Sequence, residues 1–203
     1  DVATATAVSN NAGAFSVPEL EQENPFPPGW SHAQTARATW QDAGHAYPEL
    51  PTGNGFCMLI RRQVLDAVGL FDVAAFPQGY GEENDFCQRA SARGLRHLIA
   101  GNVHVAHARS LSFGSDRRQA LGQAGMQVLR ERWPNYESDV GRTLFSFARR
   151  VLDWRLRVSQ SSSPSRSPLP RCLHLKNSRS QDRSHEHWLL DVQGEQMNLV
   201  AVD

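Results

Sequence analysis

The sequence predicts an α/β fold, because segments typical of strands alternate with segments typical of helices. Residues 2–8 alternate β-branched with small side chains. Residues 56–60 form a short, wholly apolar run like those of buried strands. A helical segment over residues 61–68 follows and ends at Gly69.

Further helices and a third strand continue this alternation. Ser31 is placed to cap a short helix that extends to residue 43. A longer helix is expected over residues 82–93. Strand character returns over 95–105, with an interruption at Gly101-Asn102. We therefore expect a sheet flanked by helices.

Changes in composition divide the chain. A low-complexity run of serine and proline reads as a linker, and residues 172–175 and 197–202 beyond it look like strands around a helix near 184–191. The expected parts are an α/β region (1–115), a helical extension (116–158), the linker (159–170) and the start of a truncated second α/β domain (171–203).

The composition is that of an ordinary globular protein, with 40% hydrophobic and 21% charged residues. Equal numbers of basic and acidic residues, 21 of each, argue against a nucleic-acid-binding protein. The sequence shows no apolar run of the ~18 residues needed for a membrane span and no signal-peptide pattern at its start. Three cysteines without CxxC pairing favour a reducing compartment, so a cytoplasmic location is expected.

Charge is unevenly distributed between the two halves. Residues 1–110 hold 11 acids and 7 bases, a net charge of −4, whereas residues 111–203 hold 10 acids and 14 bases, a net charge of +4. Carboxylate chemistry is therefore expected in the first half, and contact with an anionic partner or surface in the second.

The densest polar motif is GYGEEND, which opens the helix expected over 82–93. Glu82 and Glu83 fall in its first turn, where backbone amides favour an anion. Asp85 lies four residues before Arg89, a favourable pairing on one helical face. These acids fit two interpretations, a helix cap or a functional site.

Two histidine pairs are candidate metal ligands. His104 and His107 are three residues apart on a strand, so their side chains point to opposite faces and do not chelate one ion together unless the strand ends between them. His107 lies at a strand-to-loop edge, where sites of α/β proteins commonly form. His185 and His187 diverge if they lie on a helix, which disfavours a metal site there.

Three segments, in this order and spacing, resemble a known family. They are TGNGFCMLIRRQVLDAVGLFD (52–72), FPQGYGEENDFCQRASARG (76–94) and VHVAHARSLSFG (103–114). Residues 1–115 are similar to the C-terminal, acceptor-side half of inverting family 2 glycosyltransferases, which have the GT-A fold, a Rossmann-like mixed sheet flanked by helices. The variants look most like bacterial enzymes of cell-surface polysaccharide synthesis, including rhamnosyltransferases.

This resemblance implies a role for several residues. The second acid of the family's acidic pair acts as general base, and Glu83 occupies that position, with a glutamate where aspartate is commoner. Glu82 would help to bind the acceptor, which would be a glycan or a lipid-linked sugar. The turn Gly53-Asn54-Gly55 would let the backbone approach a bound sugar.

The resemblance also implies a nucleotide-sugar donor and a divalent metal, Mn²⁺ or Mg²⁺. His107 matches a histidine that completes the metal site on the diphosphate in several members, and Ser112 would contact the donor. The family's Asp-x-Asp metal motif should lie upstream of Asp1. We therefore expect the chain to be part of a longer enzyme.

Two alternatives to an active transferase remain open. One is a non-catalytic carbohydrate-binding or interaction fragment, in which the fold persists without the donor half. The other is a metal-dependent hydrolase, which would require a fuller set of ligands than a histidine and a carboxylate pair.

The helix expected over 137–158 carries an apolar stripe with a spacing of four, three, four, three and four residues. The stripe consists of Val140, Leu144, Phe147, Val151, Trp154 and Val158. Arginines are distributed around it. The stripe either packs on the α/β region or lies on an anionic membrane, which would make the protein peripheral at the inner face of the membrane.

Overall fold

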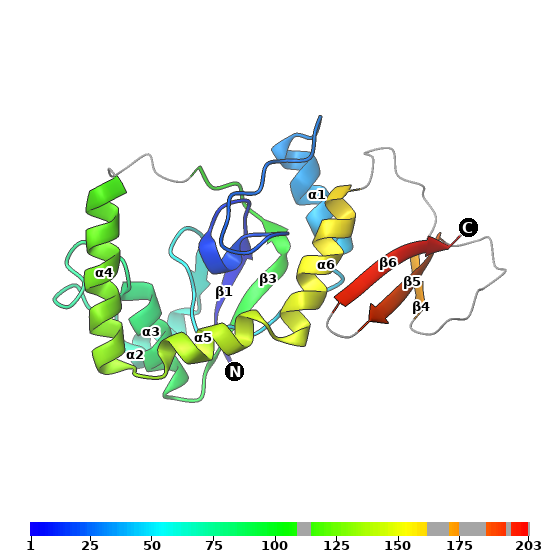
Figure 1. Ribbon diagram of the computed structural model, residues 1–203. Helices are drawn as coiled ribbons and strands as arrows, with labels where there is room; N and C mark the ends of the chain where they lie inside the picture. The colour runs from blue at the N-terminus through cyan, green and yellow to red at the C-terminus, as the bar shows by residue number, and fades with distance from the viewer. Residues whose placement is uncertain (109–114, 162–170, 175–185, 194–195, 203) are drawn as a thin grey trace. The chain divides into compact units, whose positions relative to one another are not determined.

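The computed structural model describes residues 1–108, 115–161, 171–174, 186–193 and 196–202 (Figure 1). The chain divides into two compact units, Asp1–Ser162 and Ser163–Asp203. Both contain a sheet, and helices cover the sheet of the first unit, so the α/β class is confirmed. Among the described residues, no helix is long and apolar enough to span a membrane.

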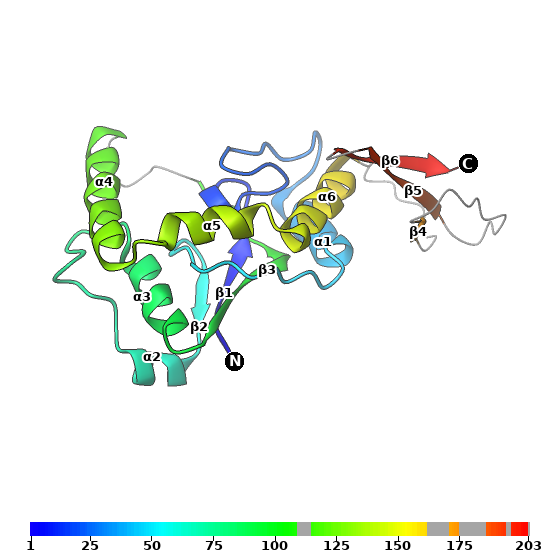
Figure 2. The same cartoon turned by 60° about the horizontal axis from the view of Figure 1, so that its bottom comes forward.

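The sheet of the first unit is built around β1 (Val2–Val8), as predicted for residues 2–8. β1 pairs antiparallel with β2 (Met58–Ile60) and parallel with β3 (Arg96–His104), which gives the order β2-β1-β3 (Figure 2). Ala5 lies opposite Leu59 on one side and Leu98 on the other. The register therefore places an apolar row across one face of the sheet.

The apolar run 56–60 was expected to be a strand buried on both faces, and the structure corrects this. Met58 and Ile60 pack against the core, but Leu59 between them is 73% exposed. Because successive side chains of a strand point to opposite faces, only one face of β2 is covered. β2 is also shorter than predicted and lies at the edge of the described sheet.

The predicted interruption of the third strand takes the form of a change in register. β3 is continuous from Arg96 to His104. Ala7 of β1 pairs with Ala100, yet the next residue, Val8, pairs with His104. The three residues between Ala100 and His104 therefore bulge out of the ladder, which increases local twist and redirects the end of the strand.

Local signals explain the first three helices. Before α1 (His32–Asp42), the Ser31 side chain accepts a hydrogen bond from the Gln34 backbone N–H. The Gln34 side chain in turn accepts one from the Ser31 backbone N–H, which completes a capping box. α2 (Arg62–Val68) ends at a glycine, as predicted. α3 (Glu82–Ser91) begins as predicted and ends two residues before the expected end at residue 93.

The helix expected over 137–158 is two helices. After α4 (Ser115–Arg132), α5 (Tyr136–Leu144) and α6 (Phe147–Ser161) are separated by a break at Phe145-Ser146. The buried face of α6 is not the predicted stripe. It consists of Arg149, Leu152, Asp153, Leu156 and Ser159.

Two hydrophobic clusters hold the helices to the sheet. In the first, Leu152 and Leu156 of α6 pack with Val8 and Ile99, and α5 contributes Leu144 at its edge. The second packs α2 and α3 against the start of β1 and against β2. α1 and α6 lie side by side (Figures 1 and 2).

A buried arginine ties α6 to the segment after β1. The Arg149 side chain is fully buried, and its Nε donates to Asp153 Oδ1 at 2.8 Å. Its terminal nitrogens donate to the carbonyl oxygens of Ala14 and of Ser16, the latter at 2.8 Å. Burial raises the pKa of Asp153 to about 6, against the opposing effect of Arg149. The pair therefore depends on its hydrogen bonds to offset desolvation.

The second unit is a three-stranded sheet in the order β4-β5-β6. β4 (Arg171–His174) runs parallel to β5 (Glu186–Gln193), and β5 pairs antiparallel with β6 (Gln196–Val202). The helix expected near 184–191 is therefore wrong, because most of this segment is strand β5. β5 and β6 form a hairpin that the local sequence pattern did not indicate, with pairs running from His187 opposite Val202 to Gln193 opposite Gln196.

Several predictions fall outside the described residues. The linker expected over 159–170 begins inside α6, and residues 162–170 lie outside the described part. His185 lies outside it as well, and His187 is described by its backbone alone, so the disfavoured metal pair is not tested. Cys57 and Cys87 are free thiols.

Replacement of Arg149 by alanine should destabilise the first unit strongly. The change leaves the Asp153 carboxylate and two carbonyl oxygens buried without their donor. We expect the free energy of unfolding to fall by about 3–5 kcal/mol, measured by urea denaturation. Arg142→Ala is the matched control, because Arg142 forms an exposed pair with Asp139, and its loss should cost under about 1 kcal/mol. Equal effects of the two variants would contradict the anchoring role of Arg149.

Protonation of His104 should destabilise the fold in acid. Burial, and to a lesser degree His32, lowers the pKa of His104 from 6.5 to about 4. The folded state therefore favours the neutral ring, and stability present above pH 6.5 is lost as the pH falls toward 4. The loss attributable to His104 should reach about 3 kcal/mol.

Chemical denaturation between pH 7 and 4 tests this expectation. His104→Gln should lose less stability over that range than the unaltered chain. The buried His97, whose pKa burial also lowers, should leave a residual slope. His45→Gln, a change at an exposed position, is the control and should leave the pH dependence unchanged. An unaltered slope in His104→Gln would exclude His104 as its source.

Candidate functional site

A sharp turn places the acidic residues at the start of α3. Gly79, Tyr80 and Gly81 all have positive φ angles of 81°, 66° and 132°, a conformation that only glycine adopts readily. The Gly81 backbone N–H donates to Glu82 Oε2 at 3.1 Å. Glu82 therefore closes the N-terminus of its own helix.

Helix α4 packs directly on this turn. A β-carbon at Gly125 of α4 would overlap the carbonyl oxygen of Tyr80, and one at Gly81 would overlap the Phe76 ring. The absence of a side chain at Gly125 allows α4 to approach the turn closely, and the absence of one at Gly81 leaves room for the Phe76 ring. The position of the acidic residues therefore depends on the helical extension.

Glu83 faces the turn 53–55. Its Oε1 accepts a hydrogen bond from the Gly55 backbone N–H at 3.4 Å. Its Oε2 is buried and has no hydrogen-bond partner within the described part of the chain. Burial, and then the neighbouring Glu82 carboxylate, raises the pKa of Glu83 above its ordinary value of 4.5. Such a carboxylate has an increased proton affinity.

Packing and hydrogen bonding shape the turn itself. A β-carbon at Gly53 would overlap Met58 Sδ and lie 3.4 Å from Cys87 Sγ, so a larger residue there would displace the Met58 side chain. Asn54 Oδ1 accepts from the Phe56 backbone N–H at 3.2 Å. The side-chain oxygen of Asn54 therefore stabilises the turn. Burial raises the pKa of Cys87 to about 12, which keeps this thiol protonated and unsuited to nucleophilic attack.

Three residues that sequence reasoning missed connect this turn to α3 and α5. Asn84 Nδ2 donates to Thr52 Oγ1 at 2.5 Å and to Tyr136 Oη at 2.7 Å. The Tyr136 hydroxyl donates in turn to Thr52 Oγ1 at 3.3 Å. The position of Asn84 next to Glu83 is visible in the sequence, but its partner Tyr136 lies 52 residues away, so the contact is not.

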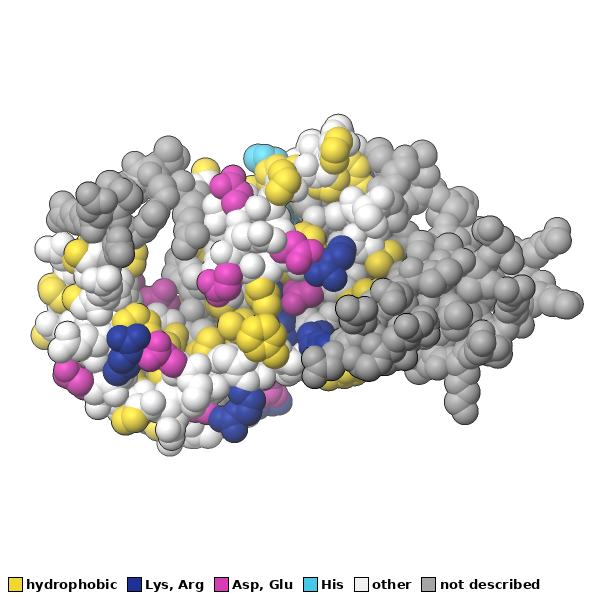
Figure 3. Space-filling model, viewed as in Figure 1, with side chains coloured by type: hydrophobic (Ala, Val, Ile, Leu, Met, Phe, Trp, Pro, Cys, Tyr) yellow, Lys and Arg dark blue, Asp and Glu magenta, His cyan; other side chains and the backbone are white. Residues whose placement is uncertain are grey.

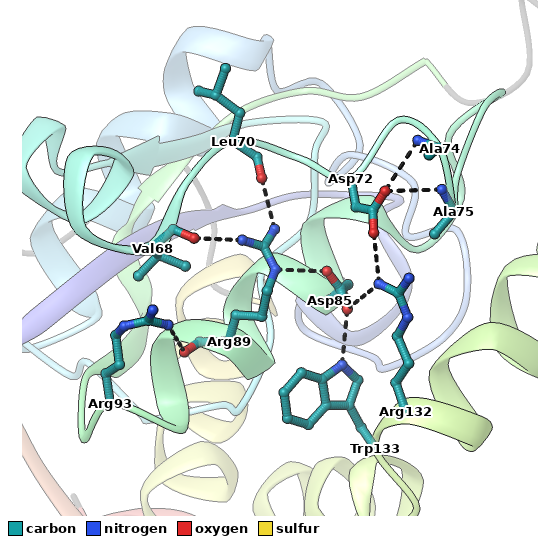
Figure 4. A network of polar contacts seen from close by, with 10 residues as sticks. All are labelled: Val68, Leu70, Asp72, Ala74, Ala75, Asp85, Arg89, Arg93, Arg132 and Trp133. Atoms are coloured by element: carbon teal, nitrogen blue, oxygen red, sulfur yellow. Dashed lines mark hydrogen bonds and ion pairs between the residues drawn. The ribbon is translucent and has the colours of Figure 1, made fainter.

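Asp85 is the centre of a second network, shown in Figure 4. Its fully buried carboxylate accepts from Arg89 Nε at 2.8 Å, from Trp133 Nε1 at 3.0 Å and from Arg132 at 3.3 Å. The predicted pairing of Asp85 with Arg89 is confirmed. Arg89 also donates to the carbonyl oxygens of Val68, at the end of α2, and of Leu70. Arg132 donates to Asp72 at 2.9 Å. The network therefore joins α3, the end of α4 and the segment between α2 and α3.

His107 lies beside the loop that follows β1. Its Nδ1 is 2.7 Å from the carbonyl oxygen of Asn11, and its backbone N–H donates to Asn10 Oδ1 at 2.8 Å. Because a carbonyl only accepts, Nδ1 carries the proton and Nε2 of the neutral ring carries the lone pair. This is the arrangement in which a metal-ligating histidine is oriented by a backbone carbonyl. The ring stacks on Phe56, with centroids 5.2 Å apart.

The structure thus brings several of the expected site residues into one region. Glu83 contacts Gly55, and the next residue, Phe56, stacks on His107. Glu82 lies in the same turn of α3 as Glu83. Ser112 lies outside the described residues. No group of three or more histidine, cysteine, aspartate or glutamate side chains able to hold a metal ion occurs within the described part of the chain.

Comparisons with protein-family models, with curated proteins and with solved structures find no match to this chain.

Replacement of Asp85 by alanine should loosen α3 and the segment before it. Two arginines and an indole would lose their common acceptor. We expect a loss of about 3–5 kcal/mol in the free energy of unfolding. Hydrogen exchange, measured by mass spectrometry, should increase most in residues 68–89. Glu49→Ala removes an exposed partner of Arg96 and serves as the control, with a loss under about 1 kcal/mol.

Proposed function

We propose that this chain contributes the acceptor side of an inverting sugar transferase that uses a nucleotide-sugar donor. The resemblance of residues 1–115 to family 2 glycosyltransferases of GT-A fold motivates the proposal. The observation that carries it is the Glu83 carboxylate, whose Oε2 is buried and free of hydrogen bonds among the described residues.

Glu83 has the properties of a general base. Its raised pKa brings its proton affinity closer to that of a base active near neutral pH. In the proposed reaction, Glu83 takes the proton of an acceptor hydroxyl as that oxygen bonds to the anomeric carbon. The bond from that carbon to the diphosphate oxygen breaks at the same time, and the bonding electrons leave with the nucleoside diphosphate. Attack from the opposite face inverts the anomeric centre.

The surrounding residues would orient the acceptor. The Gly55 N–H fixes one oxygen of Glu83, which leaves the other oxygen to meet the hydroxyl. Thr52, Asn84 and Tyr136 hold the turn against α3, so that the carboxylate and the turn keep their separation. The acceptor would be a glycan or a lipid-linked sugar, and Glu82 would lie next to it.

His107 fits a place in a divalent-metal site. Its Nε2 carries the lone pair, because Nδ1 is held by the Asn11 carbonyl. A bound Mn²⁺ or Mg²⁺ would stabilise the charge that develops on the departing diphosphate. The family's Asp-x-Asp carboxylates and the diphosphate oxygens would provide the remaining ligands. On this proposal, the nucleotide is held by the donor half that the resemblance places before Asp1.

Glu83→Gln should abolish transfer while donor binding persists. The amide keeps the shape of the side chain but does not accept the proton of the acceptor hydroxyl. We expect the turnover rate of the full-length enzyme to fall by roughly 10²–10⁴-fold. Transfer from a panel of UDP-, dTDP- and GDP-sugars would be measured, together with calorimetric binding of the nucleotide that supports transfer.

Glu83→Asp is the matched control, because it retains a carboxylate on a shorter side chain. This variant should keep measurable transfer, and its rate, like that of the unaltered enzyme, should fall as the pH drops below the pKa of the base. Undiminished turnover in Glu83→Gln would contradict the role of Glu83. Saccharide binding without transfer in the unaltered full-length protein would instead favour a non-catalytic carbohydrate-binding module.

A further inference from the structure

The break between α5 and α6 exposes two aromatic side chains. Phe145 is 70% exposed and Phe147 is 74% exposed, on either side of Ser146. The adjacent Ala148 is exposed as well, and the preceding Leu144 is half-buried. Figure 3 shows the described surface coloured by side-chain type, in the orientation of Figure 1.

Arginines border the two phenylalanines on both sides. Arg142, three residues before Phe145, has a side chain that is 76% exposed and pairs with Asp139. Arg150, three residues after Phe147, is also exposed, and this spacing places it on the same face of α6. Of the three arginines in residues 140–152, Arg149 is buried against Asp153, so Arg142 and Arg150 are the exposed arginines beside the phenylalanines. The exposed apolar tip therefore has one exposed arginine on each side.

We propose that this tip, residues 142–150, inserts into the surface of an anionic lipid membrane. Phenylalanine side chains enter the boundary between headgroups and acyl chains, and arginines beside them attract anionic headgroups. The proposed contact differs from the expected stripe over 137–158. Leu144 packs at the edge of the core, and the face of α6 that is buried lies away from Phe147.

The small size of the tip favours a membrane over a protein partner. A stable protein interface takes roughly 800 Å² from each partner, far more than two phenyl rings and two guanidinium groups supply. A bilayer accepts a small apolar wedge without a complementary groove, and its anionic headgroups match the charge of the arginines.

Sedimentation with lipid vesicles tests the proposal on the full chain. The unaltered chain should bind vesicles of phosphatidylcholine mixed with phosphatidylglycerol more tightly than vesicles of phosphatidylcholine alone. Phe145→Ser combined with Phe147→Ser should weaken this binding by at least about tenfold. Arg142→Gln and Arg150→Gln should each weaken it by about fivefold, and salt above about 0.1 M should reduce the effect of these charges.

Leu70→Ser combined with Val73→Ser is the matched control. These side chains are 73% and 75% exposed and lie in a different segment, so their loss should leave vesicle binding unchanged. Thermal melting followed by circular dichroism checks that each variant is folded.

Three results would overturn the proposal: no binding of the unaltered chain to anionic vesicles, equal binding by the double phenylalanine variant, or equal weakening by the control. A dimer in light scattering that the phenylalanine changes dissociate would instead identify the tip as a contact between two copies.

Discussion

The position of the acidic helix depends on one buried carboxylate. Asp85 is fully enclosed, so its charge is tolerated only because Arg89, Arg132 and Trp133 donate to it together. These donors come from α3 itself and from the end of α4, and Arg89 also reaches the segment after α2. An interaction with this many contributors fixes the direction of α3, and with it the place of Glu83 two residues earlier.

Short-range patterns predicted the elements that are stabilised locally. The capping box at Ser31 and the glycine after α2 were readable from adjacent residues. Within the site, the sequence predicted the first-turn position of Glu83 and the pairing of Asp85 with Arg89, both set by the helix repeat. The contact between Glu83 and Gly55 joins residues 28 apart, and only the family resemblance suggested their common role.

Features decided by distant partners escaped prediction. The apolar spacing over 137–158 fits one continuous helix, yet the buried side of α6 contains Arg149 and Asp153 because carbonyl oxygens near residue 15 require donors. Likewise, β5 is a strand because β6 pairs with it, although the local sequence also suits a helix. Tyr136 belongs to the candidate site because its hydroxyl accepts a hydrogen bond from the side-chain amide of Asn84, 52 residues away. Periodicity indicates which side of a helix or strand is apolar. It does not indicate which polar groups of neighbouring segments still need a hydrogen-bond partner.

The close approach of Gly125 to the Tyr80 carbonyl limits which helices could replace α4 in this protein. A methyl group at residue 125 would push α4 away from the turn that begins α3. Helix α4 and the acidic turn are therefore matched to each other, although their contact points lie 45 positions apart in the sequence. A recombination event that exchanged everything after residue 115 for another helical tail would replace a matched surface with an arbitrary one.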